Sequence, residues 1–367
     1  MSPEAASLTR QRAVEMSGDE SVVVGPLLGY HHETYVFPLP ATAGGAQPVR
    51  WKCREPRGGL LWFDRRCFVS EEQLLASLRG RISGIPEIIE AGGVRLQRFV
   101  EGRTLGALCA SGLPVPDAVC RQIVRLFSEM AAVTPETLPA ERRCRAADRP
   151  ENGDTDGFLE RLVAFTEERV YWGNQHRFGG LFAELGLNGD CFGQLRKHVA
   201  GLGERPFCLL HADLHRENFI VDPDGRLWTI DWELALFGDP LYDLATHLYL
   251  MRYPARQAQH MARRWAAAVE GVRAGSAHGW QRDLPRLIGY KRAQSVFTDV
   301  IRVALSLDTA PDILGQQLAG ARRKIHRILA AAAGPLGLDS VPGHRRIEAA
   351  LRGWAGDQDR SRPAARR

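Results

Sequence analysis

Three polar residues arranged around one tight turn are the part of the chain best suited to chemistry. Asp213 and Asn218 lie close together, and Asp231 follows two apolar, strand-like segments that flank the turn Asp222–Gly225. The turn sequence Asp-Pro-Asp-Gly predicts a β-hairpin. The hairpin would bring Asn218 at its entrance near Asp231 at its exit. An amide oxygen and a carboxylate that meet in this way suit Mg²⁺, which prefers oxygen ligands.

Asp213 would add a second carboxylate beside such a cation. A carboxylate in that position can orient a hydroxyl group and accept its proton. Phosphoryl transfer needs this combination, because the protein mainly has to align the reacting oxygens and neutralise the charge that develops. The three residues therefore predict a phosphoryl-transfer site.

The same residues carry a resemblance to a known family. The segments HADLHREN (211–218) and IDWE (230–233) resemble the catalytic and metal-binding loops of the kinase fold, and their details resemble the aminoglycoside phosphotransferase/choline kinase family. The segment GDPLYDLA (238–245) resembles the one that follows in that family. The similarity extends over roughly residues 20–330.

This resemblance implies a role for each matching residue. Asp213 would be the catalytic base, and Asn218 and Asp231 would hold Mg²⁺ against the phosphates of ATP. Lys52, in the segment VRWKC, resembles the strand lysine that binds the α- and β-phosphates. Glu71 resembles its partner on a helix, and Glu72 remains an alternative.

Further contacts to nucleotide and acceptor follow from the resemblance. The segment Arg98, Phe99 and Val100 resembles the hinge that binds adenine through its backbone, and His215 would lie near the γ-phosphate. Residues 25–34 would cover the phosphates, although they lack the pattern GxGxxG. Glu233 and Asp239 would frame the acceptor. GTP in place of ATP and the oligomeric state are left open by the sequence.

The resemblance implies a fold of class α+β, bilobal and protein-kinase-like, with a small β-rich N-lobe and a larger, mainly helical C-lobe. The N-lobe would span residues 21–101, with one helix that carries Glu71, Leu74, Leu75 and Leu78 on one face. Short β-branched or aromatic segments predict its strands at Val22–Val24, Thr34–Leu39, Val49–Arg54, Ile85–Glu90 and Val94–Val100.

The C-lobe would span residues 102–350 and contain the catalytic and metal loops at 207–245. Apolar periodicity predicts its helices at Val115–Val133, Phe158–Val170, Phe192–Val199, Leu241–Tyr253, Ala255–Val272, Pro285–Leu305 and Pro311–Ala333. Residues 1–20 are expected to be flexible. Residues 351–367 are expected to form a disordered basic tail.

Composition excludes several other classes of protein. The 48 basic and 43 acidic residues give a net charge of +5 and are interleaved, which argues against nucleic-acid binding. No uncharged apolar run reaches the roughly 20 residues that span a membrane, and the acidic start of the chain does not resemble a signal peptide. We therefore expect a cytoplasmic protein. The seven cysteines lack a CxxC motif, so most should be reduced core residues rather than disulfide or zinc ligands.

Other roles for the same residues remain open. His211, Asp213 and His215 alternate and could bind a transition metal, as could His31-His32-Glu33. Each candidate also has a structural explanation, such as a carboxylate or amide that caps a turn, or an exposed basic strand face at Lys52. For His211 we favour a buried ring that braces the loop backbone.

The sequence thus predicts an ATP- and Mg²⁺-dependent O-phosphotransferase that acts on a hydroxyl group of a small molecule. The arginine-rich composition suggests a GC-rich bacterium, in which the family that this chain resembles often phosphorylates antibiotics. The acceptor would be an aminoglycoside or a nucleoside- or sugar-containing antibiotic. The alternatives are a primary-metabolite kinase that acts on an amino alcohol, such as a choline-like substrate, or on a sugar, and a non-catalytic, nucleotide-binding pseudokinase.

Overall fold

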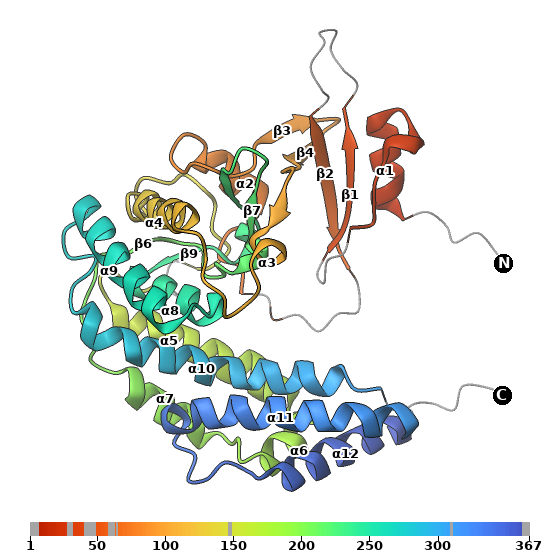
Figure 1. Cartoon of the computed structure of the whole chain (residues 1–367), viewed down its shortest axis with the longest axis vertical. Coiled ribbons are helices and arrows are strands. Elements are labelled where there is room, and N and C mark those ends of the chain that lie inside the picture. The colour runs from red at the N-terminus through yellow and green to blue at the C-terminus, as the bar shows by residue number, and fades with distance from the viewer. Residues whose placement is uncertain are drawn as a thin grey trace, which may run out of the picture. The chain divides into compact units, whose positions relative to one another are not determined.

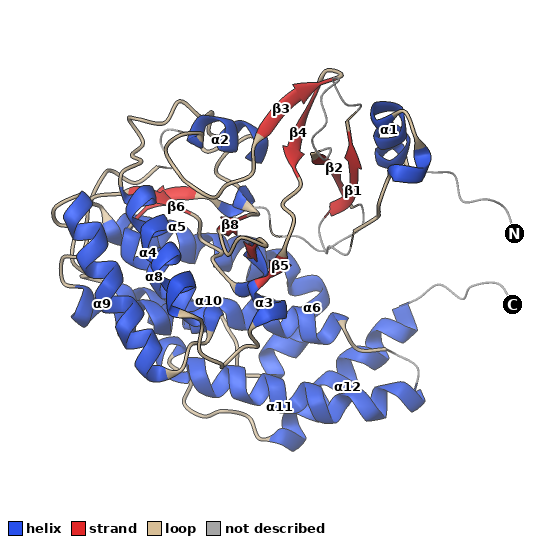
Figure 2. Ribbon diagram, turned by 45° about the horizontal axis from the view of Figure 1, so that its top comes forward, coloured by secondary structure: helices blue, strands red, loops and turns tan. Residues whose placement is uncertain are grey.

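The structure, a computed structural model, describes residues 7–27, 32–39, 49–57, 63, 65–145, 149–308 and 311–361. The chain divides into two compact units. Unit 1 comprises residues 1–145, 207–237 and 250–274, and unit 2 comprises residues 146–206, 238–249 and 275–367. A small β-sheet region at the N-terminus is followed by a larger helical part, which confirms the predicted fold class (Figures 1 and 2).

Unit 1 contains all the described strands and several helices. Its strands are β1 (His32–Pro38), β2 (Arg50–Pro56), β3 (Ile88–Ala91), β4 (Val94–Arg98), β5 (Arg103–Thr104), β6 (Cys208–Leu210), β7 (Phe219–Val221), β8 (Leu227–Thr229) and β9 (Leu236–Gly238), which ends at the unit boundary. Its helices are α1 (Leu8–Ser17), α2 (Glu71–Leu78), α3 (Leu105–Leu108), α4 (Asp117–Ala131) and α9 (Ala255–Val272), with short 3-10 turns at Glu20–Val22, Arg216–Asn218 and Trp232–Leu234.

A four-stranded antiparallel sheet of order β1-β2-β4-β3 forms the N-terminal part of unit 1 (Figure 1). Lys52 on β2 lies opposite Val36 on β1 and Gln97 on β4. Helix α1 packs on β1 and β2 (Figure 1). The core between them contains Ala13, Tyr35, Phe37, Trp51, Cys53 and Leu96. Helix α2 packs against β3 and β4, so the sheet holds the helix that carries Glu71.

The predicted hairpin forms as β7 and β8, with Phe219 opposite Thr229 and Val221 opposite Leu227. β5 pairs on the other side of β7. The sheet β6-β9 and the packed helices α4 and α9 complete unit 1. The hairpin therefore supplies a rigid ribbon between Asn218 and Asp231.

The described elements of unit 2 are helical (Figure 2). They are α5 (Thr155–Phe165), a π-helical turn (Thr166–Tyr171), a 3-10 turn (Trp172–Asn174), α6 (Gln175–Glu184), α7 (Asp190–Val199), most of α8 (Pro240–Met251), α10 (Trp280–Leu305), α11 (Pro311–Leu336) and α12 (His344–Ser361). Its core includes an aromatic cluster around Phe297, which stacks on Phe192 with ring centroids 4.8 Å apart. Tyr171 and Phe182 also contact this ring.

Two terminal segments differ from the prediction. Residues 8–17, expected to be flexible, form α1, which Ser7 caps at its start through the backbone N–H of Arg10. Residues 351–361, assigned to a disordered tail, belong to α12. Buried Ile347, Leu351 and Trp354 give this helix an apolar face. Since the basic residues around them are exposed, the charge of the tail concealed this pattern.

Internal elements also depart from the prediction. A 3-10 turn at Glu20–Val22 replaces the first expected strand, because Asp19 accepts a hydrogen bond from the backbone of Ser21 and caps the turn. Val24 nevertheless pairs with Val36 as an isolated bridge. Helix α6 was not predicted. Within the described residues no helix has the length and apolar character that crossing a membrane requires.

Candidate active site

The catalytic-loop residues Asp213 and Asn218 lie in contact within unit 1. The side-chain amide nitrogen of Asn218 donates to the backbone oxygen of Asp213 over 2.9 Å and to Asp213 Oδ2 over 3.3 Å. Asn218 is buried, whereas the Asp213 side chain is 30% exposed. Asp213 is thus held by a buried amide and remains accessible to a substrate.

The same loop is tied to the segment that carries Asp231. The backbone N–H of Ile230 donates to Asn218 O over 3.0 Å. The buried ring of His211 binds Ile230 O through Nε2, also over 3.0 Å, and packs on Trp232 with ring centroids 4.7 Å apart. His211 is therefore a structural residue that braces the loop backbone, as the sequence indicated.

Backbone conformation directs the last of the three residues. Asp231 has φ 65° and ψ 60°, in the left-handed region that residues other than glycine rarely adopt. Such a conformation is maintained only when the surroundings fix it. Here the hairpin on one side and the 3-10 turn at Trp232–Leu234 on the other fix the backbone at this residue.

The electrostatics place Asp213 and Asp231 near the same groups. The charges of both carboxylates act on His211, His215 and Glu233. The hairpin register and these shared neighbours bring Asp213, Asn218 and Asp231 together within unit 1. That the three form one catalytic site stays a prediction.

His215 controls the protonation of Asp213. His215 Nε2 lies 3.4 Å from Asp213 Oδ2. Burial acts to raise the pKa of Asp213, but the hydrogen bond and charge of His215, with His211 and Arg65, outweigh it and lower this pKa below its usual value. Burial acts in the opposite sense on His215, yet Asp213 raises its pKa. The carboxylate of Asp213 is thus ionised at neutral pH.

The residues that the sequence assigned to Mg²⁺ fit that ion. The amide nitrogen of Asn218 faces Asp213, so its oxygen is the atom that can bind a cation. This oxygen and the Asp231 carboxylate are donors of the type Mg²⁺ prefers, and Mg²⁺ in proteins keeps several waters and phosphate oxygens as its other ligands. Two protein ligands therefore suffice for a magnesium site at this place.

Lys52 lies on β2 near these carboxylates, but its expected partner, Glu71, forms an ion pair with Arg54 instead. Burial lowers the pKa of Lys52 to about 8, with a contribution from Arg54, while Asp231 and Glu72 oppose this shift. The expected ion pair between Lys52 and Glu71 is not formed. Glu71 Oε2 contacts the guanidinium of Arg54, and Glu71 Oε1 accepts the backbone N–H of Trp232 over 2.9 Å.

Arg54 takes the place of the lysine for a simple geometric reason. It lies two residues after Lys52, on the same face of β2, and its longer side chain reaches α2. Arg54 Nε also lies 3.5 Å from Glu72 Oε1. Glu71 thus joins β2 to the loop after Asp231 through Arg54, and within the described residues Lys52 forms no ion pair.

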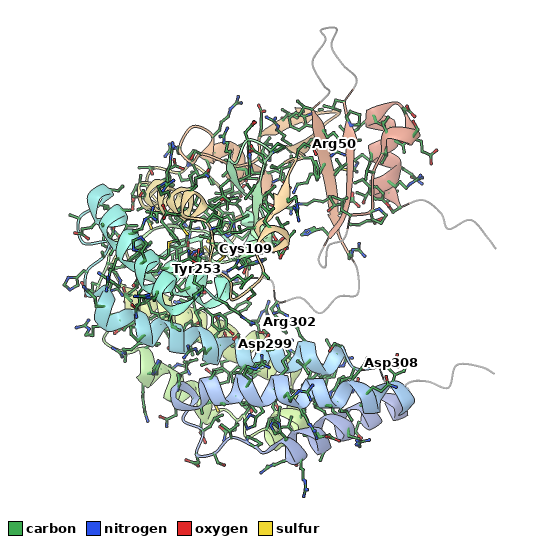
Figure 3. The ribbon with its side chains drawn as sticks, viewed as in Figure 1. Arg50, Cys109, Tyr253, Asp299, Arg302 and Asp308 are labelled. Atoms are coloured by element: carbon green, nitrogen blue, oxygen red, sulfur yellow. The ribbon has the colours of Figure 1, made fainter. Side chains whose placement is uncertain are left out.

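The predicted hinge begins at the last residue of β4, Arg98, and continues beyond the strand. The backbone N–H of Arg98 donates to Glu87 O, and that of Phe99 donates to Arg50 O (labelled in Figure 3). These two groups are therefore used within the protein, and among the described residues no acceptor binds the N–H of Val100. Side chains of the hinge and of the first strands line a cavity of about 590 Å³, namely Val22, Pro38, Val49, Arg50, Arg98, Phe99 and Glu101.

The expected phosphate-covering segment, residues 25–34, is partly described. The backbone N–H of Leu27 donates to Thr34 O over 2.8 Å, which continues the pairing of Val24 with Val36. Residues 28–31 lie outside the described residues. The alternative metal site at residues 31–33 is outside them in part for the same reason.

Glu233 and Asp239, which the sequence assigned to the acceptor, differ in their surroundings. Glu233 lies 3.9 Å from His32 Nε2 and lines a cavity of about 180 Å³ with Arg54, Arg66 and the start of α2. Burial and the charge of Asp231 raise the pKa of Glu233 to about 7. Glu233 thus remains compatible with a polar ligand.

Asp239 has a structural role, which corrects the prediction. It is 1% exposed and binds Arg205 Nε through both carboxylate oxygens, at 2.8 and 2.9 Å. It also accepts from the hydroxyl of Thr155 and the backbone N–H of Leu241. Arg205 in turn binds Asp283. These contacts occupy both oxygens of Asp239 within unit 2.

Three arginines with structural contacts were missed at the sequence level: one in each of these two networks and one that anchors the catalytic loop. They are Arg54, Arg205 and the buried Arg216, which donates to the backbone oxygens of Cys109, Leu113 and Met251 and so anchors the catalytic loop. In a chain this rich in arginine, no local pattern distinguishes a buried arginine from an exposed one. Only Arg54 gave a signal, because it shares a strand face with Lys52.

The transition-metal alternative is not supported. Among the described residues, no three His, Cys, Asp or Glu side chains converge as metal ligands do. His211 Nε2 is bound to a backbone oxygen, and His215 is paired with Asp213. His211 therefore braces the loop backbone, and His215 pairs with the Asp213 carboxylate.

Comparisons with known proteins identify the family and the fold of this chain. A sequence model of the phosphotransferase enzyme family (APH) matches residues 70–278, which is more than half of the chain. A choline/ethanolamine kinase family protein from Mesorhizobium loti is 17% identical, with 94% of this chain and 98% of that chain covered and a TM-score of 0.50. Choline kinase LicA from Streptococcus pneumoniae is 15% identical, with 89% and 99% covered and a TM-score of 0.51. These two structures share the fold.

Proposed function

Because the chain belongs to the phosphotransferase enzyme family and is a small-molecule kinase with an alcohol group as acceptor, we propose that it transfers the γ-phosphate of ATP to a hydroxyl group of an antibiotic, with Mg²⁺ as cofactor. The observation that carries this proposal is the contact of Asn218 with Asp213, next to the backbone link that joins Asn218 to the Asp231 segment. It combines a proton acceptor and a cation site in one place.

Asp213 is the catalytic base in this proposal. The acceptor oxygen attacks the γ-phosphorus, the bond from that phosphorus to the β–γ bridging oxygen breaks, and Asp213 takes the hydroxyl proton. The lowered pKa keeps Asp213 ionised and ready to accept. His215, paired with Asp213, orients the carboxylate, and its raised pKa favours the protonated ring beside the transferred group.

The nucleotide is held by groups of unit 1. Lys52 binds the α- and β-phosphates, and the N–H of Val100 donates to the base. Asn218 and Asp231 would hold Mg²⁺, which would neutralise charge on the phosphates. Glu71 acts through Arg54 and the backbone of Trp232, so it positions the metal-binding segment and does not touch the nucleotide.

A second candidate acceptor is an amino alcohol of primary metabolism. It is favoured by the two choline or ethanolamine kinase structures with which this chain shares its fold. The polar cavity at Glu233, with its carboxylate beside His32 and Arg54, gives no preference between a cationic amino alcohol and a sugar hydroxyl. A pseudokinase is the least favoured reading, because Asp213, Asn218 and Asp231 are all present.

The proposal is tested by incubating the protein with ATP or GTP, Mg²⁺ and a panel of aminoglycosides, nucleoside antibiotics, other sugar-containing antibiotics, choline and ethanolamine. Mass spectrometry should show the gain of one phosphate on one antibiotic. Asp213→Asn should slow this reaction by about 10²–10⁴-fold. Asp224→Asn, an exposed carboxylate in the turn of the same hairpin, should react like the wild type.

The results separate the candidates. Phosphate on choline or ethanolamine but on no antibiotic would favour the primary-metabolite kinase. No phosphorylated product from the whole panel, together with binding of ATP, would favour the pseudokinase. Product formed equally well by Asp213→Asn would contradict the assigned base.

A further inference from the structure

Two cysteines bring their thiols together from segments far apart in the sequence. The Sγ atoms of Cys67 and Cys144 are 3.5 Å apart, although 77 positions separate the two residues. Both side chains are half-buried, whereas four of the other five cysteines are buried. The sequence expectation that most cysteines are core residues therefore does not describe this pair.

The backbone holds the two thiols in place. Phe68 and Arg142 form an antiparallel bridge, and the N–H of Arg143 donates to Cys67 O over 2.9 Å. This register puts Cys67 opposite Arg143 and next to Cys144. The short distance between the thiols thus follows from paired backbone and not from two flexible side chains.

We infer that Cys67 and Cys144 are an oxidative modification site, a dithiol that a peroxide converts reversibly into a disulfide. One thiol ionises and its thiolate attacks a peroxide oxygen, the O–O bond breaks, and a sulfenic acid and hydroxide form. The hydroxide takes up the proton that the thiol lost and becomes water. The second thiol attacks the sulfenic sulfur, the S–S bond forms, and the S–O bond breaks to release another water. The two electrons lost by the sulfurs reduce the peroxide, and an added dithiol reverses the change.

Little movement is needed for this reaction. A disulfide bond is about 2 Å long, so the sulfurs have to approach by about 1.5 Å from the observed 3.5 Å. Rotation of two half-buried side chains can supply most of this approach. The backbone bridge can therefore persist in the oxidised form.

The cross-link would fasten the segment that leads into α2. Phe68 and Arg142 both pack on Phe237. The ring centroids of Phe68 and Phe237 are 5.8 Å apart, and the guanidinium carbon of Arg142 lies 4.5 Å from the ring centre of Phe237. Ser70, which caps α2, follows shortly after Cys67. A bond to Cys144 would thus hold the start of α2 to residues 141–145, and we expect it to stabilise unit 1.

The test treats the full-length protein with hydrogen peroxide after complete reduction, followed by a maleimide that blocks the remaining thiols. Intact mass should show two fewer maleimides, and a tryptic digest should contain one peptide that joins Cys67 to Cys144. Cys109→Ser is the matched control, since Cys109 is the third half-buried cysteine and lies at the end of α3 (Figure 3). This control should form the same cross-link.

Thermal unfolding provides a second measurement. Oxidised wild-type protein should unfold several degrees above the reduced protein, and reduction should reverse the shift. Cys67→Ser and Cys144→Ser should unfold like the reduced wild type and show no response to peroxide. Cys67→Ala replaces Cys67→Ser if the latter does not fold. A folded wild type whose two thiols stay reduced, or a mixture of pairings that includes Cys109, would overturn the inference.

Discussion

Replacing Asp239 by asparagine should make unit 2 easier to unfold and leave the chemistry of the folded protein unchanged. Arg205 and Asp239 are 0% and 1% exposed, and the substitution leaves the buried guanidinium with one carboxylate partner, Asp283. Breaking a buried ion pair by removing one partner costs about 3–5 kcal/mol. Since the new amide oxygen still accepts one hydrogen bond, we expect the lower end, about 3 kcal/mol. At about 2–4 °C per kcal/mol, the midpoint of thermal unfolding falls by about 6–12 °C.

Calorimetry together with steady-state kinetics well below the midpoint tests this prediction. Asp239→Asn should have a lower midpoint of thermal unfolding but the same KM for the acceptor as the wild type. Glu204→Gln, an exposed carboxylate next to Arg205, is the control and should shift the midpoint little. If Asp239→Asn unfolds like the wild type and raises the KM for the acceptor, Asp239 binds substrate and the structural reasoning is refuted.

The remaining predictions concern the other charged groups. Lys52→Met should raise the KM for MgATP by about tenfold or more, because a charge-assisted contact is lost. Arg54→Met should mainly lower kcat. If the two variants change KM and kcat in the same way, the separate roles of Lys52 and Arg54 are contradicted. His215→Ala should move the acid limb of the pH–rate profile to higher pH, because the partner that lowers the pKa of Asp213 is removed; an unchanged limb would contradict this coupling. The pKa of Asp283 is lowered to about 2, against burial, by Arg282 and Arg205. Asp283 therefore contributes its full stabilisation above about pH 4, and this contribution is lost as pH falls towards 2. The denaturation midpoint of Asp283→Asn should not change with pH in this way. If it changes with pH as the wild-type midpoint does, the stabilising role of Asp283 is refuted.

The hairpin beside the candidate catalytic loop could be predicted because its sequence signal is local. A turn of Asp-Pro-Asp-Gly between two apolar segments specifies a hairpin from neighbouring residues alone. The register of β7 and β8 confirms this hairpin. The hairpin in turn determines where Asn218 and Asp231 lie. The sequence analysis also favoured a buried, bracing His211, and its ring binds the backbone oxygen of Ile230.

Contacts between distant segments could not be predicted in this way. The pairing of Glu71 with Arg54 depends on how α2 packs on the sheet, and two neighbouring basic residues on one strand face are equivalent in the sequence. The burial of Asp239 depends on Arg205, which precedes it by 34 positions. The proximity of Cys67 to Cys144 depends on a backbone bridge across the chain. Periodicity describes single elements and contains no information on these pairings.

The role of Asp213 as catalytic base is tested most directly by a single-turnover measurement of phosphate transfer under saturating MgATP, with the acceptor that the panel identifies. Asp213→Asn should bind ATP like the wild type but transfer its phosphate about 10²–10⁴-fold more slowly. Asp224→Asn should be unaffected. Transfer by Asp213→Asn at the wild-type rate would show that Asp213 does not take the proton, and it would contradict the assignment of Asp213 as the catalytic base.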